Sequence, residues 1–269
     1  MNKVLVLGGT GVLGSAVVNT LQKASVDVLI GSRTQIKTDS YSTVNQSTGI
    51  PWTHVDLLTG EGLPEALTGV DTVFHLASAP GKVAGEFFET VITRNLLKAL
   101  KQSDVNHLIY SSIIGVDKIK YSYYQAKFAA EGLIQESRVP YSILRATQFH
   151  DLVDFAITKL MSLPVGFVPV KLIDQPIDVV SMAQELCRMA QSGPRQSIVN
   201  LGGPQVLDAG TLTRLWMKHR KMSKPIIPIP ILGSLMKSFA KGEHTCPEKA
   251  VGSKTWEDYL LDKYGPVSA

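Results

Sequence analysis

The strongest constraint on the fold lies in residues 4–14, Val-Leu-Val-Leu-Gly-Gly-Thr-Gly-Val-Leu-Gly. The apolar, β-branched run is typical of a buried strand, and it leads directly into three spaced glycines, Gly8, Gly11 and Gly14. Apolar residues at helical spacing follow at Val12, Leu13, Val17, Val18 and Leu21. The segment therefore predicts a strand, a glycine turn and a helix, the arrangement in which a dinucleotide pyrophosphate rests on a helix N-terminus.

Each glycine has a separate physical reason in such a turn. Gly8 permits the tight turn, Gly11 lets the backbone approach the phosphates, and Gly14 lets the helix pack close to the strand. Because any tight strand-to-helix turn favours glycine, a plain structural turn stays as the alternative. The further candidates to hold the pyrophosphate, through their backbone, are Thr10, Val12 and Leu13.

Composition places the chain among ordinary globular proteins of enzyme size. Its 269 residues are 44% hydrophobic and 19% charged, and the net charge of +4 gives no reason to propose a nucleic-acid partner. Cys187 and Cys246 are far apart, and no histidine, cysteine or carboxylate cluster has metal-ligand spacing, so we expect reduced thiols and no metal.

The late apolar run 225–239 is too short and too broken by prolines for a membrane span. The first predicted strand begins at Lys3 with no targeting segment before it, and we expect a cytoplasmic protein.

Strands and helices alternate through the first half of the chain. Strands are predicted at 26–30, 52–56, 72–76, 107–110 and 141–144. Helices are predicted at 60–67, 87–102 and 124–137. This alternation implies right-handed crossovers, and it predicts an α/β fold with a Rossmann-type doubly wound parallel sheet. The polar segment 34–50 is expected to be an exposed loop.

The regular alternation of predicted strands and helices ends at about residue 146. The second half is predicted to hold helices at 151–161, 180–191 and 209–220, an apolar stretch at 165–170 and a strand at 197–201. We expect one integrated domain in which residues 1–150 form the NAD(P)-binding Rossmann core. Residues 151–269 would complete the sheet and build a small C-terminal substrate lobe.

The end of the second strand favours one dinucleotide over the other. An acidic residue there would bind a free ribose 2′-hydroxyl, whereas a basic residue accommodates a 2′-phosphate. The strand ends in Ser32 and Arg33 without a carboxylate, so we expect NADP(H). The Arg33 guanidinium and the Ser32 hydroxyl would both hydrogen-bond the 2′-phosphate. A solvated surface arginine is the alternative interpretation of Arg33.

A catalytic group of residues is predicted around the fifth strand and the helix after it. The strand ends in Ser111-Ser112, and Tyr123 and Lys127 share a face of the helix because they are four residues apart. A lysine ammonium beside a phenol favours the phenolate and lowers the phenol pKa, which suits a proton donor or acceptor. Ser112 can hydrogen-bond a substrate carbonyl oxygen. His75 lies in an apolar strand and is interpreted as a satisfied core histidine.

Together these motifs resemble the short-chain dehydrogenase/reductase superfamily. The resemblance rests on the glycine turn, on Asp56-Leu57, on Ser111-Ser112 and on Tyr123-x-x-x-Lys127. Three further segments are similar to its atypical, NmrA-like branch of NAD(P)H-binding proteins: 31–33, 144–149 and 252–260. The match covers nearly the whole chain, most specifically residues 4–150.

The resemblance implies roles for individual residues. Asp56 would accept a hydrogen bond from the adenine amino group, with the Leu57 N–H nearby. Lys127 would hold the nicotinamide ribose. The remaining implied cofactor contacts are Ala77 and Ser78, beside the adenosine ribose and phosphates, and Thr147 and Phe149, bordering the nicotinamide and the substrate entrance.

The function implied is that of an NADP(H)-dependent oxidoreductase that transfers a hydride between the nicotinamide and a carbonyl, a quinone or a similar small molecule. Many NmrA-like proteins lack the tyrosine and bind the dinucleotide without turning it over, so a non-catalytic NADP(H)-sensing regulator is the alternative. A sugar-nucleotide or steroid-type epimerase or dehydrogenase is disfavoured by the short separation of Ser112 and Tyr123. We expect a small-molecule substrate and a monomer or homodimer.

Overall fold

The computed structural model describes residues 3–35 and 49–266, so most of the predicted loop at 34–50 lies outside the described residues. The chain forms two compact units and passes between them more than once, whereas the sequence-based description used one boundary after residue 150. The first unit comprises Met1–Ser112, Ser122–Arg145 and Met182–Val199. The second comprises Ile113–Tyr121, Ala146–Ser181 and Asn200–Ala269.

A seven-stranded parallel sheet is the centre of the fold, with the strand order β11-β8-β7-β4-β1-β2-β3. Its strands are β1 (Lys3–Leu7), β2 (Asp27–Ser32), β3 (Trp52–His54), β4 (Thr72–His75), β7 (His107–Ile113), β8 (Tyr141–Ala146) and β11 (Ser197–Leu201). Leu7 lies opposite Gly31 of β2 on one side and His75 of β4 on the other. The Rossmann-type α/β fold predicted from the alternating pattern is therefore confirmed.

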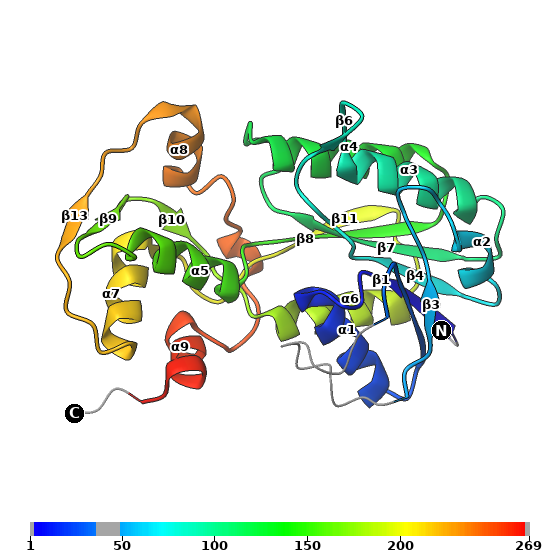
Figure 1. Ribbon diagram of the computed structural model, residues 1–269, viewed down its shortest axis with the longest axis horizontal. Helices are drawn as coiled ribbons and strands as arrows, with labels where there is room; N and C mark the ends of the chain where they lie inside the picture. Colours follow the sequence, from blue (N-terminus) through cyan, green and yellow to red (C-terminus); the bar gives the residue numbers. More distant parts are fainter. Residues whose placement is uncertain (1–2, 36–48, 267–269) are drawn as a thin grey trace. The chain divides into compact units, whose positions relative to one another are not determined.

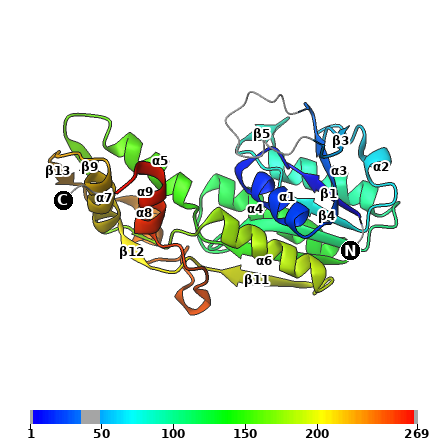
Figure 2. The same cartoon turned by 90° about the horizontal axis from the view of Figure 1, so that it is seen from below.

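Helices cover both faces of this sheet. They are α1 (Val12–Lys23), α2 (Leu63–Ala66), α3 (Phe88–Leu100), α4 (Ser122–Glu136) and α6 (Val179–Gln191). Helices α3 and α4 pack side by side on one face, and α1 and α6 lie on the opposite face (Figures 1 and 2). A sheet buried on both faces needs apolar residues in both directions, which explains the continuous apolar runs of its strands.

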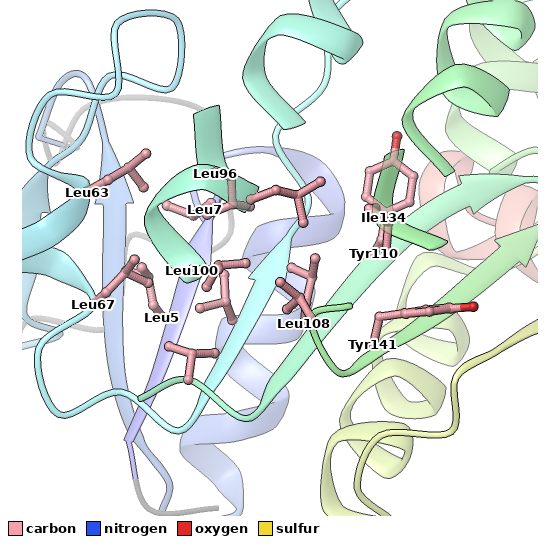
Figure 3. Packing of buried hydrophobic residues seen from close by; sticks show 14 of the residues in the cluster. Leu5, Leu7, Leu63, Leu67, Leu96, Leu100, Leu108, Tyr110, Ile134 and Tyr141 are labelled. Carbon is pink, nitrogen blue, oxygen red and sulfur yellow. The ribbon is translucent and has the colours of Figure 1, made fainter. Parts of the chain in front are cut away.

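The core beneath α3 and α4 is built from leucine-rich strands and helix faces. Figure 3 shows Leu5 and Leu7 of β1 near Leu96 and Leu100 of α3, and Leu108 of β7 lies in the same cluster. All five side chains are buried. Burial contributes roughly 25 cal/mol for each Å² of apolar surface, so this cluster fixes the positions of β1, β4 and β7 relative to α3.

The strand order places a switch point between β1 and β4. The chain leaves β1 toward β2 and β3, then crosses over to β4 and β7 on the other side. In open α/β sheets ligands bind outside the carboxyl ends of the strands at such a point. Here those ends are followed by Gly8 after β1 and by Ala77 and Ser78 after β4. A short hairpin of β5 (Lys82–Val83) and β6 (Glu86–Phe87) follows, before α3 begins.

The second unit has a core of its own, centred on Trp216 and Trp256. Trp216 donates a hydrogen bond from Nε1 to Asp154 Oδ1 at 2.6 Å, and Tyr264 donates to the same oxygen at 2.8 Å. Its elements are α5 (His150–Leu160), β9 (Gly166–Val168), β10 (Ile173–Asp174), β12 (Leu207–Asp208), α7 (Ala209–His219), β13 (Ile226–Pro228), α8 (Gly233–Ala240), a 3₁₀ turn (Pro247–Lys249) and α9 (Trp256–Tyr264). No helix among the described residues has the length and apolar character that crossing a membrane requires.

Candidate functional site

Two of the three glycines in the first turn are required by the protein's own packing. Gly8 has φ +86°, and a Cβ atom there would lie 2.6 Å from the backbone nitrogen of Ala77. A Cβ atom on Gly14 would lie 2.0 Å from the carbonyl oxygen of Gly8. The roles predicted for Gly8 in the turn and Gly14 in close helix packing therefore have a direct geometric basis.

Gly11 differs because the protein leaves room for a side chain there. A Cβ atom on Gly11 would have an ordinary contact of 3.5 Å with the Gly8 carbonyl. Gly11 is the N-cap of α1, no side chain caps this helix start, and its first turn holds no acidic residue. Packing within the described part of the protein therefore does not require glycine at position 11, and the predicted close approach of a ligand stays a prediction.

A cleft opens at this turn, and all of its lining belongs to the first unit. Nine predicted cofactor residues line it: Gly8, Thr10, Gly11, Ser32, Arg33, Asp56, Leu57, Ala77 and Ser78. The prediction missed Gly31, Val55, Leu58, Leu76, Ala79 and Phe88. Five of these six residues are direct sequence neighbours of a predicted site residue, and Phe88 is the exception.

Val12, Leu13 and Gly14 do not line the cleft. The Val12 side chain is 61% exposed, whereas Leu13 is buried. For these residues only backbone N–H groups at the start of α1 are offered to a ligand.

Two residues at the end of β2, Ser32 and Arg33, line the cleft and differ in their hydrogen bonding. Ser32 Oγ donates to the Thr34 carbonyl and accepts from Trp52 Nε1, both at 2.8 Å. The Ser32 proton is therefore already used, and the hydroxyl offers a ligand only an acceptor. The Arg33 side chain is exposed, and no residue in the described ranges pairs with its guanidinium. Of the two residues predicted to hold a 2′-phosphate, only Arg33 has side-chain donors that no residue of 3–35 or 49–266 uses.

The loop after β3 is held by its own hydrogen bonds. Asp56 Oδ1 accepts from the Leu58 N–H at 2.8 Å, and the Asp56 N–H donates to the Glu61 carbonyl at 3.0 Å. Asn95 of α3 donates to the carbonyls of Leu57 and Leu58 at 3.0 and 2.8 Å. This loop is therefore pre-organised beside the cleft.

Ser112 and Lys127 are both buried, and neither lines the cleft. Ser112 Oγ has no hydrogen-bond partner among the described residues, although the side chain is only 3% exposed. Lys127 Nζ donates to the Ser111 carbonyl at 3.1 Å and lies 3.4 Å from a Glu89 carboxylate oxygen. Because a buried hydroxyl without a partner is costly, Ser112 fits a residue that binds an oxygen of a ligand.

Tyr123 lies half-buried on α4 with its hydroxyl 2.6 Å from Ser78 Oγ. Ser78 Oγ in turn donates to Glu89 Oε1, and Tyr110 donates to Glu89 Oε2 at 3.2 Å. The neighbouring Tyr124 is buried in the core, with 3% exposure. The structure thus joins the predicted Tyr123, Ser78 and Lys127 to Glu89, which the sequence interpretation did not single out.

Thr147 and Phe149 belong to the second unit. The Thr147 hydroxyl accepts from the Gly203 N–H at 3.1 Å, and Phe149 precedes α5 and forms a bridge with Ile177. Their predicted contacts with the nicotinamide therefore stay predictions.

The remaining prominent titratable groups have structural roles. Burial lowers the pKa of His75 to about 3, and its Nε2 lies 3.0 Å from Thr93 Oγ1, whereas its Nδ1 has no partner among the described residues. His75 is therefore a neutral core histidine that is hydrogen-bonded through one of its two ring nitrogens. Burial raises the pKa of the Cys187 thiol to about 12, so this thiol stays protonated. Within residues 3–35 and 49–266, no three potential metal ligands of the His, Cys, Asp or Glu type gather.

Comparison with known proteins agrees with the glycine cleft. The sequence profile of a family described as NAD(P)H-binding matches residues 8–159. A 2-alkyl-3-oxoalkanoate reductase from Stenotrophomonas maltophilia is 30% identical over 155 residues, which are 51% of this chain and 45% of the relative. The chain spans about half the length of the curated relatives that it matches.

Solved structures share the fold at low identity. The UDP-glucuronic acid 4-epimerase from Bacillus cereus, solved with UDP-glucuronic acid and NAD, has a TM-score of 0.75 and 18% identity, covering 97% of this chain and 98% of that one. The triphenylmethane reductase of a Citrobacter species has a TM-score of 0.70 and 18% identity, covering 99% and 96%. At this identity the likeness is one of fold.

Proposed function

The chain belongs to the family of NAD(P)H-binding proteins, and from this we propose that it is an NADP(H)-dependent oxidoreductase. We place it in the NmrA-like branch of the short-chain dehydrogenase/reductase superfamily. Its reaction would transfer a hydride between the nicotinamide and a carbonyl, a quinone or a similar small molecule. The observation that carries the proposal is the presence, in one unit, of an open glycine cleft together with the half-buried phenol of Tyr123 and the buried ammonium of Lys127.

The cleft fits a dinucleotide through its open helix start and its strand-end residues. The uncapped N-terminus of α1 would hold the pyrophosphate, and Asp56 would bind the adenine. The free guanidinium of Arg33 supports NADP(H) over NAD(H), because a planar guanidinium binds a phosphate with two hydrogen bonds. When bound, the dinucleotide supplies the hydride chemistry, and the protein supplies position and proton transfer.

Three side chains would serve the reacting oxygen. Tyr123 would exchange a proton with it, because its hydroxyl is hydrogen-bonded to Ser78 at the edge of the cleft that Ser78 lines. Ser112 would donate its unpaired hydroxyl to the same oxygen. Lys127 would hold the ribose with the ammonium protons not used by Ser111 and Glu89.

The dinucleotide preference is tested by titrating NADPH and NADH into wild-type protein and Arg33→Ala, followed by the fluorescence of Trp52 beside the cleft. We expect Arg33→Ala to weaken NADPH binding about tenfold or more, the effect of losing a charged hydrogen bond, and to leave NADH binding unchanged. Lys98→Ala removes an exposed positive charge of α3 that does not line the cleft, and it should bind both like wild type. Equal affinity of wild type for NADPH and NADH would remove the argument for a 2′-phosphate site.

The catalytic role is tested by following NADPH oxidation against a panel of quinones and aldehydes. Tyr123→Phe removes the proton donor, and we expect kcat/KM to fall about 100-fold with NADPH binding retained. Tyr121→Phe removes an exposed phenol nearby in sequence and should behave like wild type. Tight NADPH binding without turnover of any substrate would instead favour the NADP(H)-sensing regulator.

Location and assembly follow the same proposal. Both cysteines are free and buried, which supports a reducing compartment such as the cytoplasm. We propose a monomer or a homodimer acting on a small molecule.

A further inference from the structure

Glu89 lies in the first turn of α3 with a fully buried side chain, at 0% exposure. Three groups from three different segments surround its carboxyl group, and each is a donor. They are the hydroxyl of Ser78 after β4, the hydroxyl of Tyr110 on β7 and the ammonium of Lys127 on α4. An ionised carboxyl group only accepts hydrogen bonds, and three donors around it, one of them an ammonium, favour this form. The resting state of Glu89 is therefore the carboxylate.

The number of hydroxyl protons decides which of Ser78 and Tyr123 donates the hydrogen bond between them. Ser78 has one hydroxyl proton, and it is donated to Glu89. The 2.6 Å contact between Ser78 Oγ and the Tyr123 hydroxyl must then use the proton of Tyr123. The phenol therefore points its proton at Ser78, and its oxygen lone pairs are left to accept a proton from a substrate.

We propose that Ser78 and Glu89 form a proton relay for Tyr123, with Glu89 as the group that finally holds the proton taken from an alcohol substrate. The inference rests on the proposed oxidoreductase function. In alcohol oxidation the substrate O–H bond breaks and a new Tyr123 O–H bond forms. The original Tyr123 proton passes to Ser78 Oγ, and the original Ser78 proton passes to Glu89 Oε1. The substrate hydride leaves for the oxidised nicotinamide dinucleotide, so the charges balance.

Carbonyl reduction uses the same relay in reverse, and it requires that Glu89 be protonated first. Ser78 and Glu89 act through Tyr123 and are positioning residues. The same hydrogen bonds hold the Tyr123 side chain in place. They are stronger at the buried Glu89 than they would be at a carboxyl group exposed to water.

Several other charged and titratable groups lie around Glu89. Lys127 faces Glu89 at 3.4 Å, and its Nζ lies 4.7 Å from the Tyr110 ring centroid. His75 packs against Tyr110 with ring centroids 5.2 Å apart, and burial keeps it neutral. The nearby Glu131 is held by Arg145. Glu89 is thus the carboxylate directly linked to Ser78.

The kinetic test compares wild type with Glu89→Gln, Ser78→Ala and Ser78→Thr. We expect kcat/KM to fall about tenfold or more in Glu89→Gln and Ser78→Ala, by the same factor in oxidation and reduction, because the equilibrium constant is fixed. Ser78→Thr keeps a hydroxyl and should restore most of the loss. In wild type, the solvent deuterium isotope effect on kcat/KM for oxidation should include the protons that move through Ser78 to Glu89, and Glu89→Gln should have a smaller isotope effect. The same kcat/KM and the same isotope effect in Glu89→Gln as in wild type would overturn the relay.

A second readout needs no turnover. The infrared spectrum of wild type minus that of Glu89→Gln should contain the stretching band of the buried Glu89 carboxyl group. The band should shift in both Ser78→Ala and Tyr123→Phe, because each breaks one link of the hydrogen-bonded chain. A band unaffected by Tyr123→Phe would refute the connection. Dinucleotide binding by wild type without any turnover would reject the proposed function, while the infrared bands would still decide whether Tyr123 and Glu89 are joined.

Discussion

At the scale of single residues, buried charges in the first unit are held by partners. Arg145 at the end of β8 contacts Glu131 of α4 through two hydrogen bonds, of 2.9 Å from Nε and 2.6 Å from an Nη atom. The Glu131 side chain is 1% exposed and that of Arg145 12% exposed. The bidentate geometry fixes the end of β8 against α4.

Removing one partner of this pair should be strongly destabilising. We expect Glu131→Gln to lower the free energy of unfolding by about 3 kcal/mol, because the variant removes the charge of one partner in a buried, bidentate ion pair. Urea denaturation followed by circular dichroism measures this. The Arg188–Glu185 pair is exposed at Arg188, and Glu185→Gln serves as the matched control with no measurable effect expected. A Glu131→Gln protein as stable as wild type would show that the pair contributes little.

His150 makes stability depend on pH in a predictable direction. Its side chain is 2% exposed, both ring nitrogens lack partners among the described residues, and it packs against the rings of Trp256 and Tyr259. Burial lowers its pKa from 6.5 to about 4. The unfolded chain therefore binds a proton more readily, and this histidine costs stability as the pH falls from about 6.5 toward 4.

The variant His150→Leu has a similar volume and cannot take up a proton. Between pH 6.5 and 4 we expect its stability to fall less steeply than that of wild type, by about 1.4 kcal/mol for each pH unit. Urea midpoints at several pH values give the two slopes. Parallel slopes would contradict the buried, neutral state of His150.

Residues with a sequence motif around them could be predicted, and Glu89 could not. Gly8, Arg33 and Asp56 follow strand ends, and all line the cleft. Glu89 follows no motif, and its three donors come from segments distant in the sequence. Only the packing of α3 against the sheet brings these groups together. A lone acidic residue at an otherwise apolar helix start is the one signal that could have marked it.

At the scale of elements, helix α9 begins with a complete capping box. Thr255 Oγ1 accepts from the Asp258 N–H at 3.2 Å, and Asp258 Oδ2 accepts from the Thr255 N–H at 2.9 Å. Two otherwise unpaired N–H groups are satisfied in this way. The cap positions Trp256 and Tyr259 in the core of the second unit.

Thr255→Ala should lower the free energy of unfolding by about 1 kcal/mol, because the N–H of Asp258 loses its acceptor. Thr255→Ser keeps the hydroxyl and should lie close to wild type. Thermal and urea unfolding of the three proteins measure the difference. Equal losses in both variants would assign the effect to the missing methyl group rather than to the cap.

Elements with strong periodicity were predicted well, and short paired segments were not. The strand predicted at 197–201 coincides with β11, and the helix predicted at 180–191 differs from α6 by one residue. The helix predicted at 60–67 is shorter, because Gly62 has φ +76° and helix α2 starts only at Leu63. The β9–β13 and β10–β12 pairs join segments far apart in sequence, so no local pattern indicates them.

At the scale of the whole molecule, the first unit holds both the cleft and the residues proposed for proton transfer. The glycine cleft, Tyr123, Lys127 and Glu89 all belong to it, and the matching family profile covers 8–159. The alternating pattern could predict this unit because each strand and helix carries its own periodicity. The division of the chain between the units depends on long-range packing, and a single boundary in the sequence did not represent it.

We propose that the cleft at the β1–α1 turn binds a nicotinamide dinucleotide, and calorimetric titration of NADPH into wild type and Gly11→Ala is the decisive experiment. Since a Cβ on Gly11 would have only a 3.5 Å contact within the protein, stability should change by less than about 1 kcal/mol. We expect one molecule of NADPH to bind wild type, and Gly11→Ala to bind it about tenfold more weakly or worse, because the methyl group blocks the approach of the phosphates. Absence of NADPH binding to wild type, or equal binding to a folded Gly11→Ala protein, would contradict the account.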